Sequence, residues 1–171
     1  MNIVVMDGSP VTDGNTDWLI QGFVKGAESA GHHVDVFRLS AMNLCGCSGC
    51  DVCKTKEDRS CVHADEMPEL EAAAENAQMI VFASPIFFFS PSSWLQMGIE
   101  RFHNTGFPKS LKKSAMLLSS GGSNVYGAAL AQYQDITSYF GLQNMGVLTA
   151  HGMENKSREK YEQAFALGQS C

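Results

Sequence analysis

A short polar segment, residues 45–61 (CGCSGCDVCKTKEDRSC), holds five of the six cysteines of the chain. Thiols gathered this closely could be disulfide staples, zinc ligands, ligands of an iron-sulfur cluster or a redox-active patch. From Cys47 the spacing is C-x2-C-x2-C-x7-C, running through Cys50 and Cys53 to Cys61. We call residues 45–61 the cysteine segment.

Chain length and ligand spacing weigh against two of these possibilities. A chain of 171 residues buries roughly 70% of its unfolded surface, so its core does not need disulfides. Structural zinc sites generally use two separated pairs of ligands, whereas three thiols at successive x2 steps suit three corners of a cubane. Two interpretations stay open: a 4Fe-4S cluster on Cys47, Cys50, Cys53 and Cys61, or reduced, metal-free thiols.

A second chemical signal is the loop GSPVTDGNT, residues 8–16, between an apolar run and a helical pattern. Backbone N–H groups at the positive end of a helix dipole hold phosphate groups, and polar side chains can add donors. The candidate donors are Ser9, Thr12, Asn15 and Thr16. An ordinary capped turn is the alternative. Neither G-x-x-x-x-G-K-[ST] nor G-x-G-x-x-G is present, which argues against ATP and tightly held dinucleotides.

Two further loops follow apolar runs. In SPIFFFSPSSW, residues 84–94, Pro85 stiffens the chain, and Ile86, Phe87 and Phe88 can offer apolar contact and backbone hydrogen bonds to a planar ring. Packing in the core or between subunits is the alternative for these aromatic residues. In SSGGSN, residues 119–124, Gly121 and Gly122 allow a ligand to approach the backbone. A plain flexible loop is the alternative there.

Alternating strands and helices must position these loops. Apolar runs predict strands at 2–6, 33–39, 79–83, 114–120 and 144–150. Helical patterns start at Asn15, after Asp65 as the cap, near 92, before Leu130 and near Asn155, and the pattern from 92 runs to 104. Such alternation predicts an α/β fold with a parallel sheet covered on both faces. The three loops and the cysteine segment then meet at the carboxyl edge of the sheet, where such folds bind ligands.

One helix carries a clear apolar pattern and a clear end. Leu130, Tyr133, Ile136 and Phe140 recur at helical spacing and predict the inward face, and Gly141 predicts the helix end.

Composition limits the partners. Twelve basic and eighteen acidic residues give a net charge of −6 with no basic stripe, so nucleic acid is not expected. The longest apolar stretch, residues 79–89, is interrupted by Ser84 and Pro85 and falls short of the ~20 residues that span a bilayer. No membrane segment is therefore predicted. The first residues carry no basic leader or cleavage pattern, which predicts a cytoplasmic location.

Taken together, GSPVTDGNT, SPIFFF, SGGS and the cysteine segment before DEM resemble the flavodoxin-like NADPH-dependent FMN reductase family, from residue 1 to about 168. Members usually carry GSPR-x-x-GNT at the first loop and SP-V-Y-F or SP-V-Y-W at the second. The resemblance implies one FMN-binding domain over residues 1–171. It also implies a three-layer sandwich with a five-stranded parallel sheet in the order 2-1-3-4-5, and a homodimer or homotetramer. Surplus apolar residues at Phe89, Trp94 and Met97 support the oligomer.

The same resemblance assigns site residues. Ser9, Asn15 and Thr16 would hold the FMN phosphate, Pro85 to Phe88 would line the isoalloxazine, and Gly121 to Ser123 would close over its edge. Val11 stands where the family usually has Arg, and Phe87 where it has Tyr. These two departures predict weaker FMN retention. The cysteine spacing resembles the compact motif of iron-sulfur flavoproteins, although flavin-only relatives share similar spacing.

The implied function is an FMN-dependent oxidoreductase. NAD(P)H would deliver a hydride to the flavin, and the electrons would pass to a small acceptor such as a quinone or another flavin. No general acid or base is predicted, because the cofactor carries the reaction. An iron-sulfur flavoprotein and a flavodoxin-type electron carrier that serves a protein partner stay open as alternatives.

Overall fold

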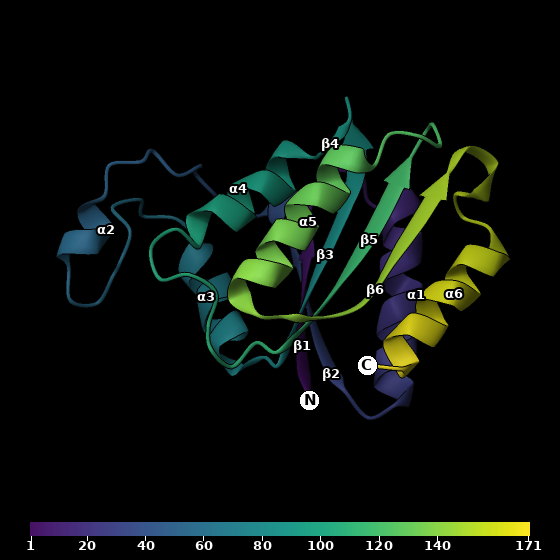
Figure 1. The fold of residues 1–171 in the computed structure, drawn as a ribbon, viewed down its shortest axis with the longest axis horizontal. Coiled ribbons are helices and arrows are strands. Elements are labelled where there is room, and N and C mark those ends of the chain that lie inside the picture. The colour runs from purple at the N-terminus through teal and green to yellow at the C-terminus, as the bar shows by residue number, and fades with distance from the viewer.

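The computed structural model describes all residues, 1–171, and its centre is one parallel sheet (Figure 1). The strands are β1 (Asn2–Asp7), β2 (His33–Arg38), β3 (Met79–Phe87), β4 (Ser90–Pro91), β5 (Lys113–Ser120) and β6 (Gln143–His151). The five longer strands run in the order β2-β1-β3-β5-β6, and the short β4 pairs antiparallel with β3. The predicted order of the five parallel strands is therefore confirmed, and β4 is an addition.

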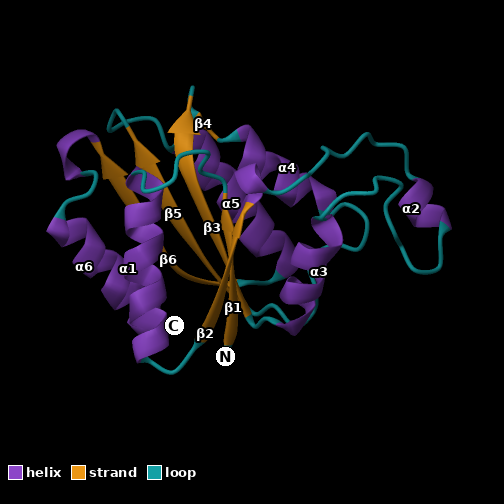
Figure 2. Cartoon of the chain, turned by 180° about the vertical axis from the view of Figure 1, so that it is seen from behind, coloured by secondary structure: helices purple, strands orange, loops and turns teal.

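Helices cover both faces of the sheet. They are α1 (Asn15–Ser29), α2 (Val52–Thr55), α3 (Met67–Asn76), α4 (Ser93–Arg101), α5 (Gly127–Phe140) and α6 (Arg158–Gln169), with 3-10 turns at Leu39–Ala41 and Gly152–Glu154. Helices α3, α4 and α5 lie on one face, and α1 and α6 lie on the other (Figures 1 and 2). The three-layer arrangement follows from the right-handed crossovers between parallel strands.

Each face of the sheet has its own apolar core. Successive side chains of a strand point to opposite faces, so Ile3 and Val5 of β1 pack with α1 and α6, whereas Val4 and Met6 pack with α3, α4 and α5. This explains why β1 reads as an uninterrupted apolar run. Both faces are thus closed by side chains, and the carboxyl edge of the sheet is left for the loops.

Helix α1 is fixed by its close approach to α6. A Cβ atom at Gly26 would lie 1.9 Å from the carbonyl oxygen of Phe165, and one at Gly168 would lie 2.1 Å from that of Phe23. No side chain fits at either position. The glycines let the two helices touch along their backbones, which sets the direction of α1 and hence the place of its amino terminus.

The structure corrects the predicted inward face of α5. Leu130 and Phe140 are exposed, Ile136 is half-buried, and only Tyr133 of the predicted set is fully buried. The buried face is centred on Ala129, Tyr133 and Thr137, because the small Ala129 and the bonded hydroxyls let the helix approach the sheet. Gly141, with φ 65°, ends the helix as predicted.

Two other boundaries differ from the sequence prediction. The N-cap of α3 is Glu66 rather than Asp65, because the Asp65 carboxylate is held by Arg101 and also accepts the N–H of Met67 at 3.3 Å. Helix α4 ends at Arg101, three residues before the predicted end at 104. No helix combines the length and the apolar character needed to cross a membrane.

Candidate functional site

The loop after β1 leads into a helix start that has no side-chain cap. Gly14 is the N-cap of α1, and the first backbone N–H to reach its carbonyl oxygen is that of Trp18, at 3.2 Å. The N–H groups of residues 15–17 therefore lack helical partners. Together with the positive end of the helix dipole they form a set of donors for an anion.

The four polar side chains predicted for this loop fall into two pairs. Thr12 and Asn15 are exposed at the loop surface. Ser9 and Thr16 are buried: the Ser9 hydroxyl lies 3.2 Å from the N–H of Val11, and the Thr16 hydroxyl lies 2.8 Å from that of Ser119. Thr12 and Asn15 are thus open to a ligand, while Ser9 and Thr16 shape the loop from inside.

The chain after β3 forms an aromatic tip, residues 87–89, at the same edge. Pro85 is half-buried and Ile86 is buried, whereas Phe87 and Phe89 are exposed and Phe88 is 96% exposed. Strand β3 extends through Phe87, so the predicted loop is partly strand. Exposed aromatic side chains are therefore available here for apolar contact with a planar ring.

The turn of the aromatic tip is strained. Phe88 and Phe89 connect β3 to β4 and have φ values of 47° and 71°. Two-residue hairpin turns of this kind usually carry Asn-Gly, because bulky residues disfavour positive φ. Strained backbone that displays exposed aromatic rings is typical of functional sites.

The loop after β5 is held in place by hydrogen bonds that involve Ser120 and Tyr126. The hydroxyl of Ser120 lies 2.6 Å from that of Tyr126 and donates to the Gly122 carbonyl oxygen at 2.6 Å. Burial raises the pKa of Tyr126, so the phenol stays protonated and donates to the Ala150 carbonyl oxygen. Gly121, Gly122 and Ser123 themselves are exposed. This leaves the predicted glycine loop open on its outer side.

Buried hydroxyl groups join the three loops to one another. Ser92 caps α4 and donates from its hydroxyl to the Gly8 carbonyl oxygen at 2.6 Å, while its N–H donates to the Ser84 hydroxyl at 2.9 Å. The Thr16 hydroxyl reaches Ser119, as described above. The loops after β1, β3 and β5 are therefore one connected unit, as the sheet topology predicts. Ser84, Ser92 and Ser119 were missed as site residues; polar residues at the ends of apolar runs were the available signal.

Two carboxylates and one arginine support the loop after β1. Asp7 accepts the N–H of Ser9 at 2.8 Å, and Asp17 accepts the N–H of Asp13 at 2.6 Å. Arg38 donates to both oxygens of Asp17 at 2.8 Å and lies 3.3 Å from Asp7. Burial raises the pKa of Asp7 from 3.8 to about 6, although Ser9 and Arg38 act in the opposite direction. Sequence reasoning missed all three charged side chains.

The cysteine segment leaves the carboxyl end of β2 but does not stay at the sheet edge. It extends beside α4, with α2 at its far end (Figure 1). The N–H of Cys47 donates to Glu100 at 2.9 Å, and the Lys54 ammonium group donates to the carbonyl oxygens of His103 and Asn104. The segment therefore contacts the carboxyl end of α4, not the loops as predicted.

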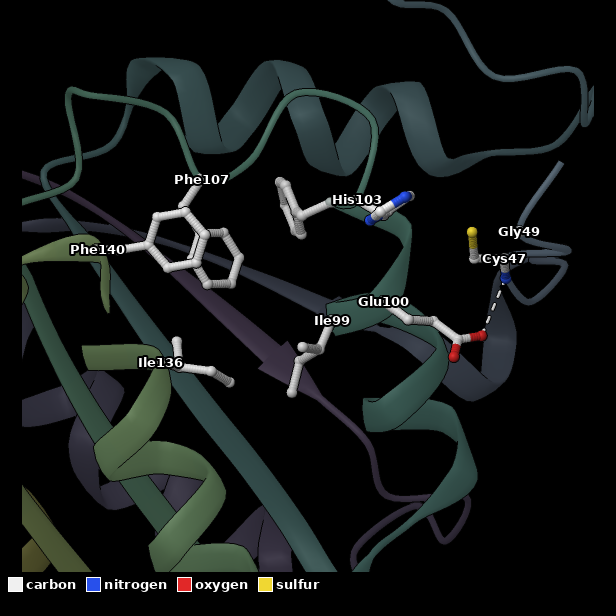
Figure 3. A pocket seen from close by; sticks show the side chains of 9 residues that line it. Cys47, Gly49, Ile99, Glu100, His103, Phe107, Ile136 and Phe140 are labelled. Atoms are coloured by element: carbon white, nitrogen blue, oxygen red, sulfur yellow. Dashed lines mark hydrogen bonds between the residues drawn. The ribbon is translucent and has the colours of Figure 1, made fainter. Parts of the chain in front are cut away.

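A hollow lies between the cysteine segment and helices α4 and α5 (Figure 3). Its volume is about 470 Å³, and its walls are mainly apolar side chains. The lining includes Cys47, Ile99, Phe107, Ile136 and Phe140. None of the three loops contributes to it, so this hollow is separate from the carboxyl-edge site.

The cysteines do not form a metal site in this arrangement. All six thiols are free, and no group of three or more His, Cys, Asp or Glu side chains is placed to hold a metal ion. Cys50 is exposed, and hydrogen bonds from the Val52 N–H and the Ser48 hydroxyl lower the pKa of its thiol. A lowered thiol pKa favours the thiolate, which is the reactive and metal-binding form.

A buried ion pair, Arg101 with Asp65, holds the start of the cysteine segment at Cys45. Arg101 donates to both carboxylate oxygens of Asp65, and their side chains are only 2% and 1% exposed. Both ends of the Cys45 peptide unit are held as well, because Arg101 donates to its carbonyl oxygen and Asp65 accepts its N–H. Burial raises the pKa of Asp65, but the bonds from Arg101 and the two N–H groups outweigh it and lower the pKa.

Two known proteins are similar to this chain in sequence. The chain is 27% identical over 139 residues to an iron-sulfur flavoprotein of Archaeoglobus fulgidus. The aligned part covers 81% of this chain and 60% of the relative. It is 26% identical over 156 residues to an iron-sulfur flavoprotein of Methanocaldococcus jannaschii, covering 88% and 80%. The chain thus spans less than two thirds of the length of the Archaeoglobus relative.

Solved structures share the fold. An NAD(P)H:quinone oxidoreductase from Methanothermobacter marburgensis superposes with a TM-score of 0.70 at 14% identity, covering 99% of this chain and 92% of the other. An archaeal flavodoxin gives a TM-score of 0.60 at 18% identity, with 99% and 94% covered. These likenesses confirm the flavodoxin-like fold. The family model described as NADPH-dependent FMN reductase matches residues 1–156, and the chain accordingly belongs to the NADPH-dependent FMN reductase family.

Proposed function

We propose that the protein is an FMN-dependent NAD(P)H oxidoreductase that passes electrons to a small acceptor such as a quinone or a flavin. The observation that carries the proposal is the joining of three loops at the carboxyl edge of the sheet, with free N–H donors at one end and exposed aromatic rings at the other. Family membership and neighbours named quinone oxidoreductase and flavone reductase support it.

The residues present fit FMN. The uncapped N–H groups of residues 15–17, with Thr12 and Asn15, suit the phosphate, and Ser9 and Thr16 hold that loop in shape. Pro85 to Phe88 suit one side of the flat ring, and the exposed Gly121 to Ser123 suit its edge. When bound, FMN supplies hydride acceptance from a nicotinamide and electron delivery to an acceptor.

The role of the chain itself would be to bind FMN and to orient it. Thr12 and Asn15 lie beside an anion site that has no cation of its own, since Val11 occupies the usual arginine position. Phe87 and Phe88 are exposed to solvent. Their side chains can cover a flat ring of the cofactor or stack with a second aromatic ring. Asp13 is the one titratable side chain in the three loops, and it lies in the loop assigned to the phosphate rather than beside the flat ring, so we assign no general acid or base.

A second function, that of an iron-sulfur flavoprotein, is favoured by the names of the two sequence relatives and by the exposed, lowered-pKa Cys50. Against it stands the arrangement of Cys47, Cys50, Cys53 and Cys61, which does not fit a 4Fe-4S cluster as found here. We therefore derive no electron path through the cysteine segment.

One anaerobic preparation tests both functions. We expect the protein loaded with FMN to oxidise NADPH or NADH and to lose its visible flavin absorbance, which an added quinone restores. Reduction only by a protein partner would instead indicate an electron carrier and would contradict the enzyme. Iron and acid-labile sulfide at about four each per chain, lost in Cys50→Ser but not in the control Cys171→Ser, would establish the iron-sulfur flavoprotein.

We also propose a homodimer or homotetramer in the cytoplasm. Six free thiols suit a reducing compartment. Of the three apolar residues predicted to need a partner, Phe89 is exposed, whereas Trp94 and Met97 pack partly against the core. Phe87 and Phe88 extend the exposed surface instead.

In this proposal the exposed rings of the aromatic tip form the interface between subunits. We expect light scattering to give at least twice the mass of one chain, and Phe88→Ser with Phe89→Ser to shift the protein toward the monomer. Tyr139→Ser, an exposed aromatic change on α5, is the matched control. A monomer for the unmodified protein at working concentration would contradict the proposal.

A further inference from the structure

The loop after β1 lacks the family's usual arginine, but an arginine from another strand is attached to it. Arg38 ends β2 and lies directly beside Asp7 in the parallel register of β1 and β2. Val11, in the loop itself, is exposed and carries no charge. Arg38 contacts the two carboxylates that flank this loop, Asp17 and Asp7.

Arg38 reaches both ends of this loop through two carboxylates. Asp7 stands before the loop and accepts the N–H of Ser9; Asp17 stands after it, in the first turn of α1, and accepts the N–H of Asp13. The guanidinium binds Asp17 through both oxygens at 2.8 Å and contacts Asp7 at 3.3 Å. One terminal nitrogen of Arg38 makes all of these contacts, so a single cation links the entry and the exit of the loop.

Asp7, Asp17 and Arg38 form a charged cluster. Two of its members have few other partners. Asp7 is 0% exposed, and its second oxygen has no hydrogen bond, nor has one terminal nitrogen of Arg38. A buried carboxylate with so little support is unfavourable by itself. Its contacts with Ser9 and Arg38 link it to the loop instead, which favours a role in holding the loop.

We propose that Arg38 is a positioning residue for cofactor binding: by clamping Asp7 and Asp17 it holds the loop of residues 8–16 in the shape that aims its N–H groups at the FMN phosphate. This inference rests on the proposed function, because it assumes that the loop receives that phosphate. Arg38 does not touch the phosphate; it acts through the two carboxylates.

Riboflavin lacks the phosphate of FMN, so the ratio of the two affinities measures what the phosphate contributes to binding. We expect Arg38→Gln to lower the affinity for FMN by about ten-fold, the size of one charge-assisted contact, and to change riboflavin affinity by less than about two-fold. Titration by flavin fluorescence measures both. Lys109→Gln removes one charge from an exposed loop before β5 and is the matched control.

Asp17→Asn separates positioning from simple attraction. Removing a negative charge beside the phosphate should strengthen FMN binding if charge alone matters, whereas a weaker link between Arg38 and Asp17 should weaken it. We expect weaker binding, and stronger binding in Asp17→Asn would overturn the inference. An unchanged FMN-to-riboflavin ratio in Arg38→Gln would also overturn it while leaving the proposed function intact. Equal affinity of the unmodified protein for FMN and riboflavin would contradict the phosphate site itself.

Discussion

Arg101→Leu is expected to lower the free energy of unfolding by about 3–5 kcal/mol, because it leaves the Asp65 carboxylate buried and unpaired. The two side chains are 2% and 1% exposed, and Arg101 also donates to the Cys45 carbonyl oxygen. Urea denaturation followed by circular dichroism measures the loss. The start of the cysteine segment should open in the same variant, which faster hydrogen exchange of the Cys45 N–H, held by Asp65 in the unmodified protein, would report.

A second substitution distinguishes the unpaired charge from lost packing. Asp65→Asn added to Arg101→Leu removes the charge but keeps an oxygen for the N–H groups of Cys45 and Met67. The double variant should therefore be more stable than Arg101→Leu alone. Arg158→Gln breaks an exposed pair with Glu162 and should change stability by less than about 1 kcal/mol. A double variant as unstable as the single one would contradict this account of the pair.

Asp7→Asn is expected to stabilise the protein above neutral pH. The folded state raises the pKa of Asp7 from 3.8 to about 6, mainly through burial, so the folded state favours the protonated acid. The resulting penalty is absent below pH 3.8 and complete above about pH 6. This difference corresponds to about 3 kcal/mol, and asparagine mimics the protonated form and can still accept the N–H of Ser9.

Denaturation of both proteins at several pH values tests this prediction. The gain in Asp7→Asn should approach about 3 kcal/mol near pH 8 and shrink as the pH falls through 6 toward 4. Asp135→Asn, on the exposed side of α5, is the control and should show no such trend. A variant less stable than the unmodified protein near pH 8 would show that the ionised Asp7 contributes more through Arg38 than burial removes.

Much of the fold could be predicted because its signals are local. The apolar run of β1 and the alternation of strands and helices predicted a parallel sheet covered on both faces, and the strand order came from the family resemblance. The inward face of α5 was not predictable from apolar spacing, since the helix approaches the sheet through Ala129 and the hydroxyls of Tyr133 and Thr137. Strand β4 was missed because its turn, Phe88–Phe89, has none of the usual turn residues.

The candidate site was predictable in outline and not in detail. The carboxyl ends of parallel strands meet, so three unusual loops could be placed together from their order in the chain. The supporting contacts join distant residues, such as Ser92 with Gly8 and Thr16 with Ser119, and no local pattern announces them. The cysteine segment was misplaced for the same reason: its position depends on Glu100 and the end of α4.

Direct comparison of FMN with riboflavin tests the central claim, that the loops at the carboxyl edge hold FMN by its phosphate. Equilibrium titration should show FMN binding at least about ten-fold tighter than riboflavin, and Asn15→Ala should remove most of that difference while Gln143→Ala, an exposed change at the start of β6, should not. Equal affinity for the two flavins, or an unchanged preference for FMN in Asn15→Ala, would contradict the assignment of the phosphate to this loop.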